Sequence, residues 1–212
     1  GVYCTTGVTP TVDCLLDLNG TSSVINAGMN GSLTINGVIS NAAALTKAGP
    51  GTLTLNGANQ FTSSVVIAAG KLVVPSDAAL GAGTTGSIAI SGAKLVFSPA
   101  LPTLSSGRTY TMGVGGGTIE VTNGNVILTV PLASTPTDSN ALVKTGSGEL
   151  TLTKNSTRSG STYVEAGVLR GFLTNTVIAQ KMKLPHTASA SRAPSSDLDV
   201  SSSNLVVSPG KD

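Results

Sequence analysis

The sequence predicts an all-β protein, and three observations support that prediction. Apolar and polar residues alternate in short runs such as Leu33–Ile35 and Leu53–Leu55, which is the period of half-buried strands. Asn-Gly and Ser-Gly dipeptides separate these runs, and both Asn and Gly tolerate the positive φ that tight corners require. No window of helical length shows a 3.6-residue period with helix caps.

Two all-β architectures fit this pattern. Asn-Gly turns between short strands are typical of an antiparallel sandwich. Strands and corners can equally be the sides of stacked coils, which would make a parallel β-solenoid. The solenoid is favoured because aromatic residues make up only 3% of the chain, small side chains are abundant, and a long segment is repeated without a gap.

The repeated segment begins with "KAGPGTLTLNGANQF", residues 47–61, and recurs as "KTGSGELTLTKNSTR", residues 144–158. The offset is constant (144 − 47 = 97) and continues without a gap to the pair Leu72 and Leu169. Because one coil cannot bury its inner face alone, such units recur until a continuous core exists. The repeat core that we predict comprises Lys47, Gly49, Gly51, Leu53 and Leu55 in the first copy, and Lys144, Gly146, Gly148, Leu150 and Leu152 in the second.

Composition and charge exclude several classes of function. The 212 residues carry a net charge of +2, and the twelve Lys and Arg residues are scattered, so no basic stripe for nucleic acid is expected. The longest apolar runs are far too short to span a bilayer, so we expect no membrane insertion of this chain. The chain begins at Gly1 without a signal-peptide pattern, so either a signal peptide has been removed or the chain is an excised fragment.

Two cysteines lie in the N-terminal segment. Cys4 and Cys14 flank a turn-forming stretch, and we expect a disulfide between them that pins an N-terminal cap of residues 1–23 in an oxidising compartment. The alternative is two free thiols. No zinc site is expected, because His186 is the only histidine and no CxxC motif accompanies it.

The stretch from Ile25 to Val74 resembles the autotransporter-associated β-strand repeat of bacterial autotransporter passenger domains. The motif consists of a Lys, a Gly-x-Gly, a Thr-Leu-Thr-Leu strand, a Gly-Ala-Asn-x-aromatic-Thr turn and an Ala-Gly-x-Leu strand, all present between residues 47 and 72. The resemblance covers roughly residues 24–172. It implies a right-handed parallel β-helix, export from a bacterium, and a structural or secretion-assisting role in place of catalysis.

The second copy departs from the motif at three positions. Glu149 stands in place of Thr52, Lys154 in place of Gly57, and Arg158 in place of the aromatic residue Phe61. We therefore expect a turn in the second copy that is packed differently or faces a partner.

No constellation of residues predicts catalysis, a cofactor or a metal site. The ten carboxylates are dispersed, and only the pairs Asp13/Asp17 and Asp197/Asp199 are close in sequence, in positions typical of solvated surface. No serine near His186 lies in a nucleophile elbow. We therefore expect a non-enzymatic protein.

The chain changes character at its C-terminal end. We divide it into a solenoid over residues 24–179 and a Ser- and Pro-rich tail over residues 180–212. The tail contains a short strand candidate formed by Leu205, Val206 and Val207. We expect this strand to dock on its own coil stack or on a neighbouring subunit, or else to act as a cap.

Two functions follow as hypotheses. The first is a non-enzymatic extracellular structural protein of a bacterial surface that assembles with itself end to end into a fibre or stalk. The second is a passenger segment of an autotransporter adhesin that displays or binds ligands, with a host or matrix surface as its partner.

Overall fold

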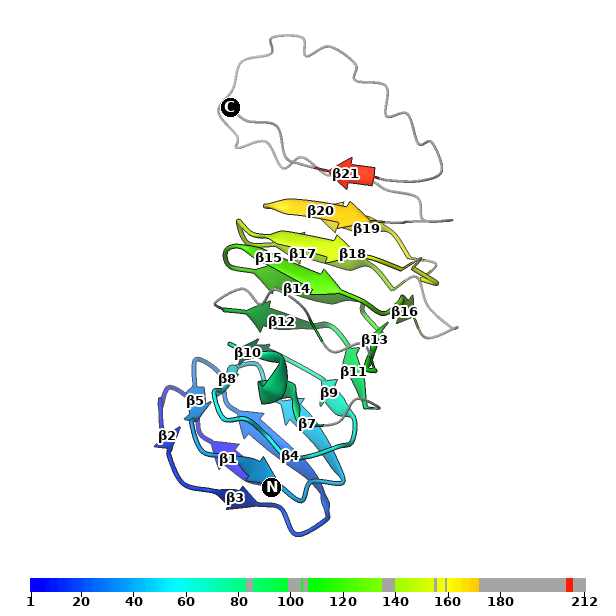
Figure 1. The fold of residues 1–212 in the computed structure, drawn as a ribbon. Helices are drawn as coiled ribbons and strands as arrows, with labels where there is room; N and C mark the ends of the chain where they lie inside the picture. The colour runs from blue at the N-terminus through cyan, green and yellow to red at the C-terminus, as the bar shows by residue number, and fades with distance from the viewer. Residues whose placement is uncertain are drawn as a thin grey trace.

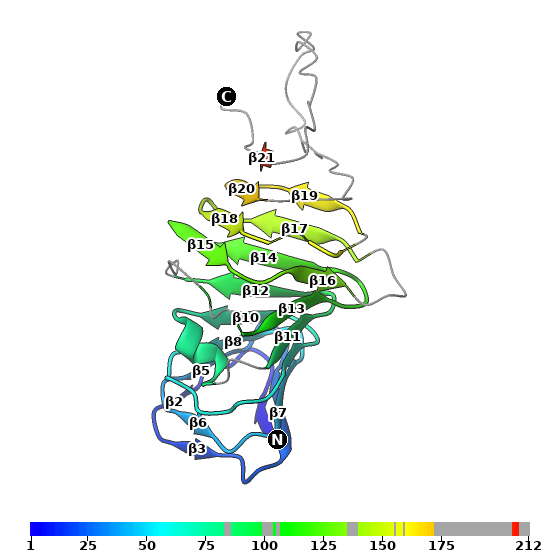
Figure 2. The ribbon, with the colours of Figure 1, turned by 45° about the vertical axis from the view of Figure 1, so that its right-hand side comes forward.

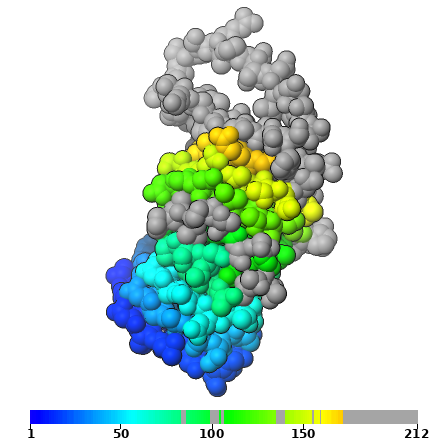
Figure 3. All heavy atoms as spheres, viewed as in Figure 1, coloured from blue at the N-terminus to red at the C-terminus, as the bar shows by residue number. Residues whose placement is uncertain are grey.

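The computed structural model of the chain is a parallel β-solenoid of about seven turns. The structure describes residues 1–82, 86–98, 104, 107–134, 140–154, 156–158, 160–171 and 205–207. The coils stack into an elongated body that runs from strand β1 (Val2–Cys4) near the N-terminus to strand β20 (Val168–Gly171) (Figures 1 and 3).

The strands form three longitudinal faces, two of which are continuous sheets (Figure 2). The first face contains β1 (Val2–Cys4), β4 (Ser22–Ala27), β7 (Ala44–Ala48), β9 (Val65–Ile67), β11 (Ser87–Ile90), β13 (Thr109–Met112) and β16 (Leu132–Ser134). The second face contains β2 (Thr11–Val12), β5 (Ser32–Ile35), β8 (Thr52–Leu55), β10 (Lys71–Val74), β12 (Ala93–Phe97), β14 (Gly117–Val121), β17 (Leu142–Thr145) and β19 (Thr162–Val164).

The third face is less regular. It begins with the pair β3 (Leu16–Asp17) and β6 (Ile39–Ser40) and ends with the sheet of β15 (Asn125–Leu128), β18 (Glu149–Leu152), β20 (Val168–Gly171) and β21 (Leu205–Val207). Between them lie irregular segments and a short 3₁₀ helix, η1 (Asp77–Leu80). The amide of Gln60 donates to the carbonyl of Ile39, and the amide of Asn59 donates to that of Ala78, so hydrogen bonding continues from coil to coil where strands are absent.

The pairing of the strands excludes the antiparallel sandwich. Every strand pair in the described part of the chain is parallel except β20 with β21. Dipeptides that are typical of hairpins form solenoid corners here: Asn19 and Asn30 have φ of 50° and 55° and turn the chain into the next face. The solenoid is confirmed, and its right-handed sense stays a prediction.

Inward side chains form apolar ladders that make up the core. On the second face the ladder runs in register through Leu33, Leu53, Leu72, Leu95 and Ile119, each 0–2% exposed. Each such side chain contributes on the order of 1.5–3 kcal/mol when fully buried. Because every rung contacts the rungs above and below it, the stability of one coil depends on its neighbours.

The expected disulfide is wrong. Cys4 and Cys14 are both free thiols. Cys4 is buried on β1 of the first face, whereas Cys14 is exposed in the turn between β2 and β3. Residues 1–23 contribute β1, β2 and β3, one strand to each face, so the first coil places the two cysteines on different sides of the solenoid.

The tail lies largely outside the described residues. Its described part is β21, which pairs antiparallel with β20 of the same chain, with Val206 opposite Arg170. The predicted strand of residues 205–207 therefore exists and lies on the last coil. In the part of the chain that the structure describes, no helix is long and apolar enough to cross a membrane.

The glycine at position 51 provides a direct test of coil stacking. A Cβ at this position would overlap the carbonyl oxygens of Gly28 and Gly31 in the preceding coil. We expect Gly51→Val to lower the free energy of unfolding by at least about 3 kcal/mol, because the clash involves backbone that cannot move without opening the stack. Chemical denaturation followed by circular dichroism measures this.

The control is Gly20→Asn. Gly20 has φ of 67°, which Asn tolerates, and no atom lies within 4 Å of the position of its Cβ. Equal stability of the Gly51→Val variant and the wild-type chain would contradict the close approach of the coils at this corner.

Candidate functional site

A buried lysine closes the corner at the start of the first repeat. Lys47 occupies an inward position of β7, between Ile25 and Ile67 in the ladder of the first face, and is 0% exposed. Its Nζ donates to the carbonyl oxygens of Ala48 at 2.9 Å, Gly49 at 2.7 Å and Ala69 at 3.0 Å. The three protons of the ammonium thus meet three acceptors, two in its own corner and one in the next coil.

Lys144 makes the same arrangement in the second repeat. It is 0% exposed, and its Nζ donates to the carbonyl oxygens of Thr145 at 2.6 Å, Gly146 at 3.0 Å and Ala166 at 3.2 Å. The acceptors stand at the same sequence separations as in the first repeat. Each lysine therefore joins one coil to the following coil; we call this arrangement the lysine cap.

Burial shifts the titration of both lysine caps. It lowers the pKa of Lys47 from 10.5 to about 8, because the charged amine has left water. Burial likewise lowers the pKa of Lys144 to about 8, while the negative charge of Glu120 acts in the opposite direction. The three carbonyl dipoles around each ammonium offset part of the cost of burying the charge.

The two repeats are equivalent locally but lie on different faces. Lys47 is in β7 of the first face, whereas Lys144 is in β17 of the second face. The Leu pairs also lie on different faces: Leu53 and Leu55 belong to the second face, and Leu150 and Leu152 belong to the third. All four side chains are 0–1% exposed. The spacing of the copies is therefore not a whole number of coils. The Leu pairs of both copies nevertheless point inward, as expected for the predicted repeat core.

The glycines of the repeat core lie beside the lysine caps. Gly49 and Gly146 both have φ of 77° and provide the carbonyls that accept from the lysines. At Gly51 and Gly148 the absence of a side chain leaves room for the backbone of the preceding coil. All ten predicted core positions thus contribute either to an inward ladder or to a corner.

The turn of the second repeat uses different buried groups. Arg158 is 2% exposed and takes the place of Phe61, which is 1% exposed. Its guanidinium donates to the carbonyl oxygens of Asn140 at 2.8 Å, Gly160 at 2.8 Å and Ser161 at 3.0 Å, and also contacts the hydroxyl of Thr162. Burial lowers its pKa to about 10. Arg158 is thus packed inward, and the expected difference in packing is accounted for without a partner.

Two polar residues of the turn also bridge coils. Asn59 accepts from the amide of Ile39 at 2.8 Å and donates to the carbonyl of Ala79 at 2.7 Å. At the matching position of the second repeat, the hydroxyl of Ser156 donates to the carbonyl of Leu132 at 2.9 Å. The other two substitutions of this repeat are at the surface: Lys154 is exposed, and Glu149 pairs with Arg170 at 2.8 Å.

Arg108 is a buried cation that the repeat motif does not predict. It is 3% exposed, donates to the carbonyl of Leu80 at 2.8 Å and to that of Gly81, and lies 3.5 Å from the carboxylate of Asp77. It ties the end of η1 to the following coil. No sequence signal distinguished it, whereas the alignment of Arg158 with an aromatic position could have identified Arg158 as buried.

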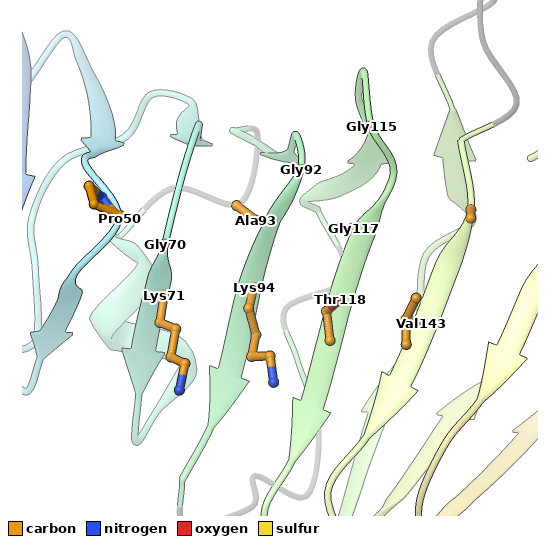
Figure 4. A pocket seen from close by; sticks show the side chains of 11 residues that line it. Pro50, Gly70, Lys71, Gly92, Ala93, Lys94, Gly115, Gly117, Thr118 and Val143 are labelled. Atoms are coloured by element: carbon orange, nitrogen blue, oxygen red, sulfur yellow. The ribbon is translucent and has the colours of Figure 1, made fainter. Parts of the chain in front are cut away.

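The second face carries a shallow groove on its outer side, near the corner with the first face (Figure 4). It has a volume of about 380 Å³, and its lining includes Gly70, Gly92 and Gly115 together with Lys71 and Lys94. In the described ranges no cluster of three or more His, Cys, Asp or Glu residues could hold a metal ion.

Both repeats match a known family of repeats. The family model for the Passenger-associated-transport-repeat matches residues 45–74 and 142–170, which contain the two lysine caps. The chain carries two autotransporter passenger repeats.

A curated relative supports this assignment. The Adhesin BmaC autotransporter of Brucella suis biovar 1 (strain 1330) is 38% identical over 102 residues, which is 46% of this chain and 3% of the adhesin. The passenger repeat chain described here therefore spans only a small part of that relative's length. No solved structure matches the chain significantly.

The lysine cap can be tested by removing the amine. We expect Lys47→Met to lower the free energy of unfolding by about 2–4 kcal/mol, because each buried carbonyl left without a donor costs about 1–3 kcal/mol and removal of a buried charge offsets only part of that cost. Lys71→Met is the matched control, since Lys71 is exposed on β10. Urea denaturation of both variants measures the difference, and equal effects would contradict a stabilising cap.

The lysine caps also predict a pH dependence. Between about pH 8 and pH 10.5 the unfolded chain binds more protons than the folded chain, because the pKa of both lysines is lowered on folding to about 8. The free energy of unfolding should therefore rise with pH above about 8, by at most about 1.4 kcal/mol per pH unit for each lysine.

The measurement is urea denaturation between pH 7.5 and 9.0. Of the other groups with a shifted pKa, Arg158 and Tyr110 titrate above this range, and Asp17 and Glu149 titrate below it. The double variant Lys47→Met, Lys144→Met should lack the rise. A rise of the same size in the double variant would assign it to other groups.

Proposed function

We propose that this passenger repeat chain is part of a non-enzymatic, extracellular protein of a bacterial surface, in which the solenoid is a rigid element that holds a binding surface away from the cell. The observation that carries this proposal is the pair of lysine caps in a continuous ladder core, because they stiffen the stack without forming a reactive site. The similarity to an autotransporter adhesin suggests an adhesin-like role and a surface location.

The placement of the carboxylates supports a structural role. Asp13 accepts from the side chain of Asn36 at 2.6 Å, and Asp17 accepts from that of Asn41 at 3.0 Å, each across adjacent coils. Glu120 pairs with Lys94 at 2.8 Å across β12 and β14. These carboxylates join neighbouring coils along the outside of the solenoid and do not converge on one point.

End-to-end self-assembly is a second candidate, and the exposed apolar residues favour it. Six large hydrophobic residues are exposed among the described residues, and five of them lie in the first two coils: Tyr3, Val8, Leu15, Val24 and Met29. The outer edges of β1, β2 and β3 pair with no strand of the described chain. We propose that a second copy of the chain adds its last coil to this edge, since unpaired strand edges and apolar surface both favour association.

The strand β21 occupies one of the two ends that such an assembly would join. It covers the edge of β20, which a second copy would need for head-to-tail stacking. We propose that the strand formed by residues 205–207 controls access to this edge, either by docking on its own chain or by docking on a neighbour.

Electron microscopy and light scattering of the purified chain test both proposals. Rods of uniform width support the rigid element, and globular particles would exclude it. The variant Tyr3→Ser, Leu15→Ser, Met29→Ser should lose any concentration-dependent association, whereas Val114→Ser should keep it, because Val114 is 68% exposed but lies far from the first coil in sequence and coil order.

Removal of residues 181–212 separates the two modes of docking. If β21 covers β20 in the same chain, the truncated chain should form longer assemblies. If β21 docks on a neighbour, truncation should abolish assembly. Unchanged assembly would exclude β21 from the mechanism, and monomers under all conditions would exclude self-assembly.

A further inference from the structure

The outer groove crosses several coils along the solenoid axis. Its lining runs from Pro50, past the starts of β10, β12 and β14, to Val143 on β17. With the corner before β8, where Pro50 lies, the groove crosses five rungs. The four intervals between them, of about 4.8 Å each, span about 19 Å. Glycines form much of its floor, so the groove is open to an extended chain that lies perpendicular to the strands.

Two lysines on adjacent rungs face this groove. Lys71 and Lys94 are direct partners in the pairing of β10 with β12, and their side chains extend side by side (Figure 4). Like charges on directly neighbouring positions destabilise a sheet. Glu120 pairs with Lys94 at 2.8 Å, but no carboxylate in the described part of the chain pairs with Lys71. The groove thus keeps an uncompensated positive charge at a position where the fold alone would not favour one.

The remaining lining is suited to a polymer that is both polar and apolar. Thr118 follows Lys94 on the next strand and offers a hydroxyl, and Val143 follows Thr118. Pro50 and Val143 provide small apolar surfaces at the two ends. Cationic, hydroxyl and apolar groups therefore succeed one another at the spacing of the coils.

We infer that this groove binds a linear acidic polysaccharide, with Lys71 as its principal contact to a carboxylate or sulfate of the sugar chain. The inference rests on the proposed adhesin-like surface role and names the ligand class of that surface. Sugar rings of an extended chain repeat at a distance comparable to the spacing of the rungs, so when one acidic group meets Lys71 the neighbouring rings lie over the neighbouring coils. Pro50 and Val143 contact the apolar faces of the rings.

The geometry disfavours the other polyanions. A peptide usually gains affinity by adding a strand to a free sheet edge, but the strands beneath the groove, β8 to β17, are paired on both sides. A nucleic acid requires several phosphate contacts, whereas the groove holds two lysines, one of them already paired.

Isothermal titration calorimetry with a hexamer of galacturonic acid tests the inference on the full chain, with the neutral maltohexaose as the matched ligand. We expect binding of the acidic hexamer that weakens as salt is raised, and no binding of the neutral one. Lys71→Gln should weaken binding about tenfold, as expected for loss of one charge-assisted contact. Lys154→Gln, which removes an exposed lysine outside the groove, should leave it unchanged.

A second variant tests the groove by its shape. Gly92 has φ of 60°, and a Cβ there would have only the carbonyl oxygen of Val114 nearby, at 4.0 Å, so Gly92→Asn can fill the groove without disturbing the backbone. We expect it to abolish binding, whereas Gly20→Asn, at a similar φ in a distant corner, should not.

Three outcomes would overturn the inference: no binding of the acidic hexamer, equal binding of acidic and neutral hexamers, or equal binding of a polyglutamate peptide to the same groove. None of these affects the proposal of a rigid surface element, which depends on rod formation. Binding that survives both Lys71→Gln and Gly92→Asn would place the site elsewhere.

Discussion

The corner carbonyls of each coil are the constraint on which this solenoid depends. At the corners that follow β7 and β17, backbone oxygens accept from a buried ammonium, because buried backbone carbonyls need a partner. The ammonium of Lys47 satisfies three of them at once and reaches Ala69 in the next coil. Placing a cation in an otherwise apolar ladder is costly. Among the described residues no carboxylate forms a salt bridge with Lys47, so carbonyl dipoles offset this cost.

Other buried side chains donate to backbone carbonyls elsewhere in the solenoid. Lys144 repeats the lysine cap, while Arg158 and Arg108 use a guanidinium to reach carbonyls of their own and neighbouring corners. Asn59 and Ser156 do so with neutral groups. Together with the apolar ladders, these groups join the coils in a chain with only 3% aromatic residues. Regular coil-to-coil contacts of this kind make stability local and additive along the axis.

The inside and the outside of the coils obey different requirements. Packing specifies the inward positions, so the same residue type, leucine, fills the equivalent positions 53 and 150 although they lie on different faces. Packing does not specify the outward positions. Two lysines at directly neighbouring outward positions, Lys71 and Lys94, therefore point to a function of this surface. A solenoid can thus change its surface chemistry rung by rung without altering its core, which suits a protein that displays a surface.

The sequence by itself determined the all-β class and the corner glycines, and it favoured parallel coils with inward leucines over a sandwich, because strand periodicity and close backbone approach are local properties that a repeat makes visible. Only the tertiary structure decided which face each repeat occupies, since the number of residues per coil varies and shifts Lys144 to the face beside that of Lys47. It also decided that Cys4 and Cys14 stay apart and that Arg158 points inward. These features depend on how the chain closes each coil and stacks it on the next, and no local pattern specifies that.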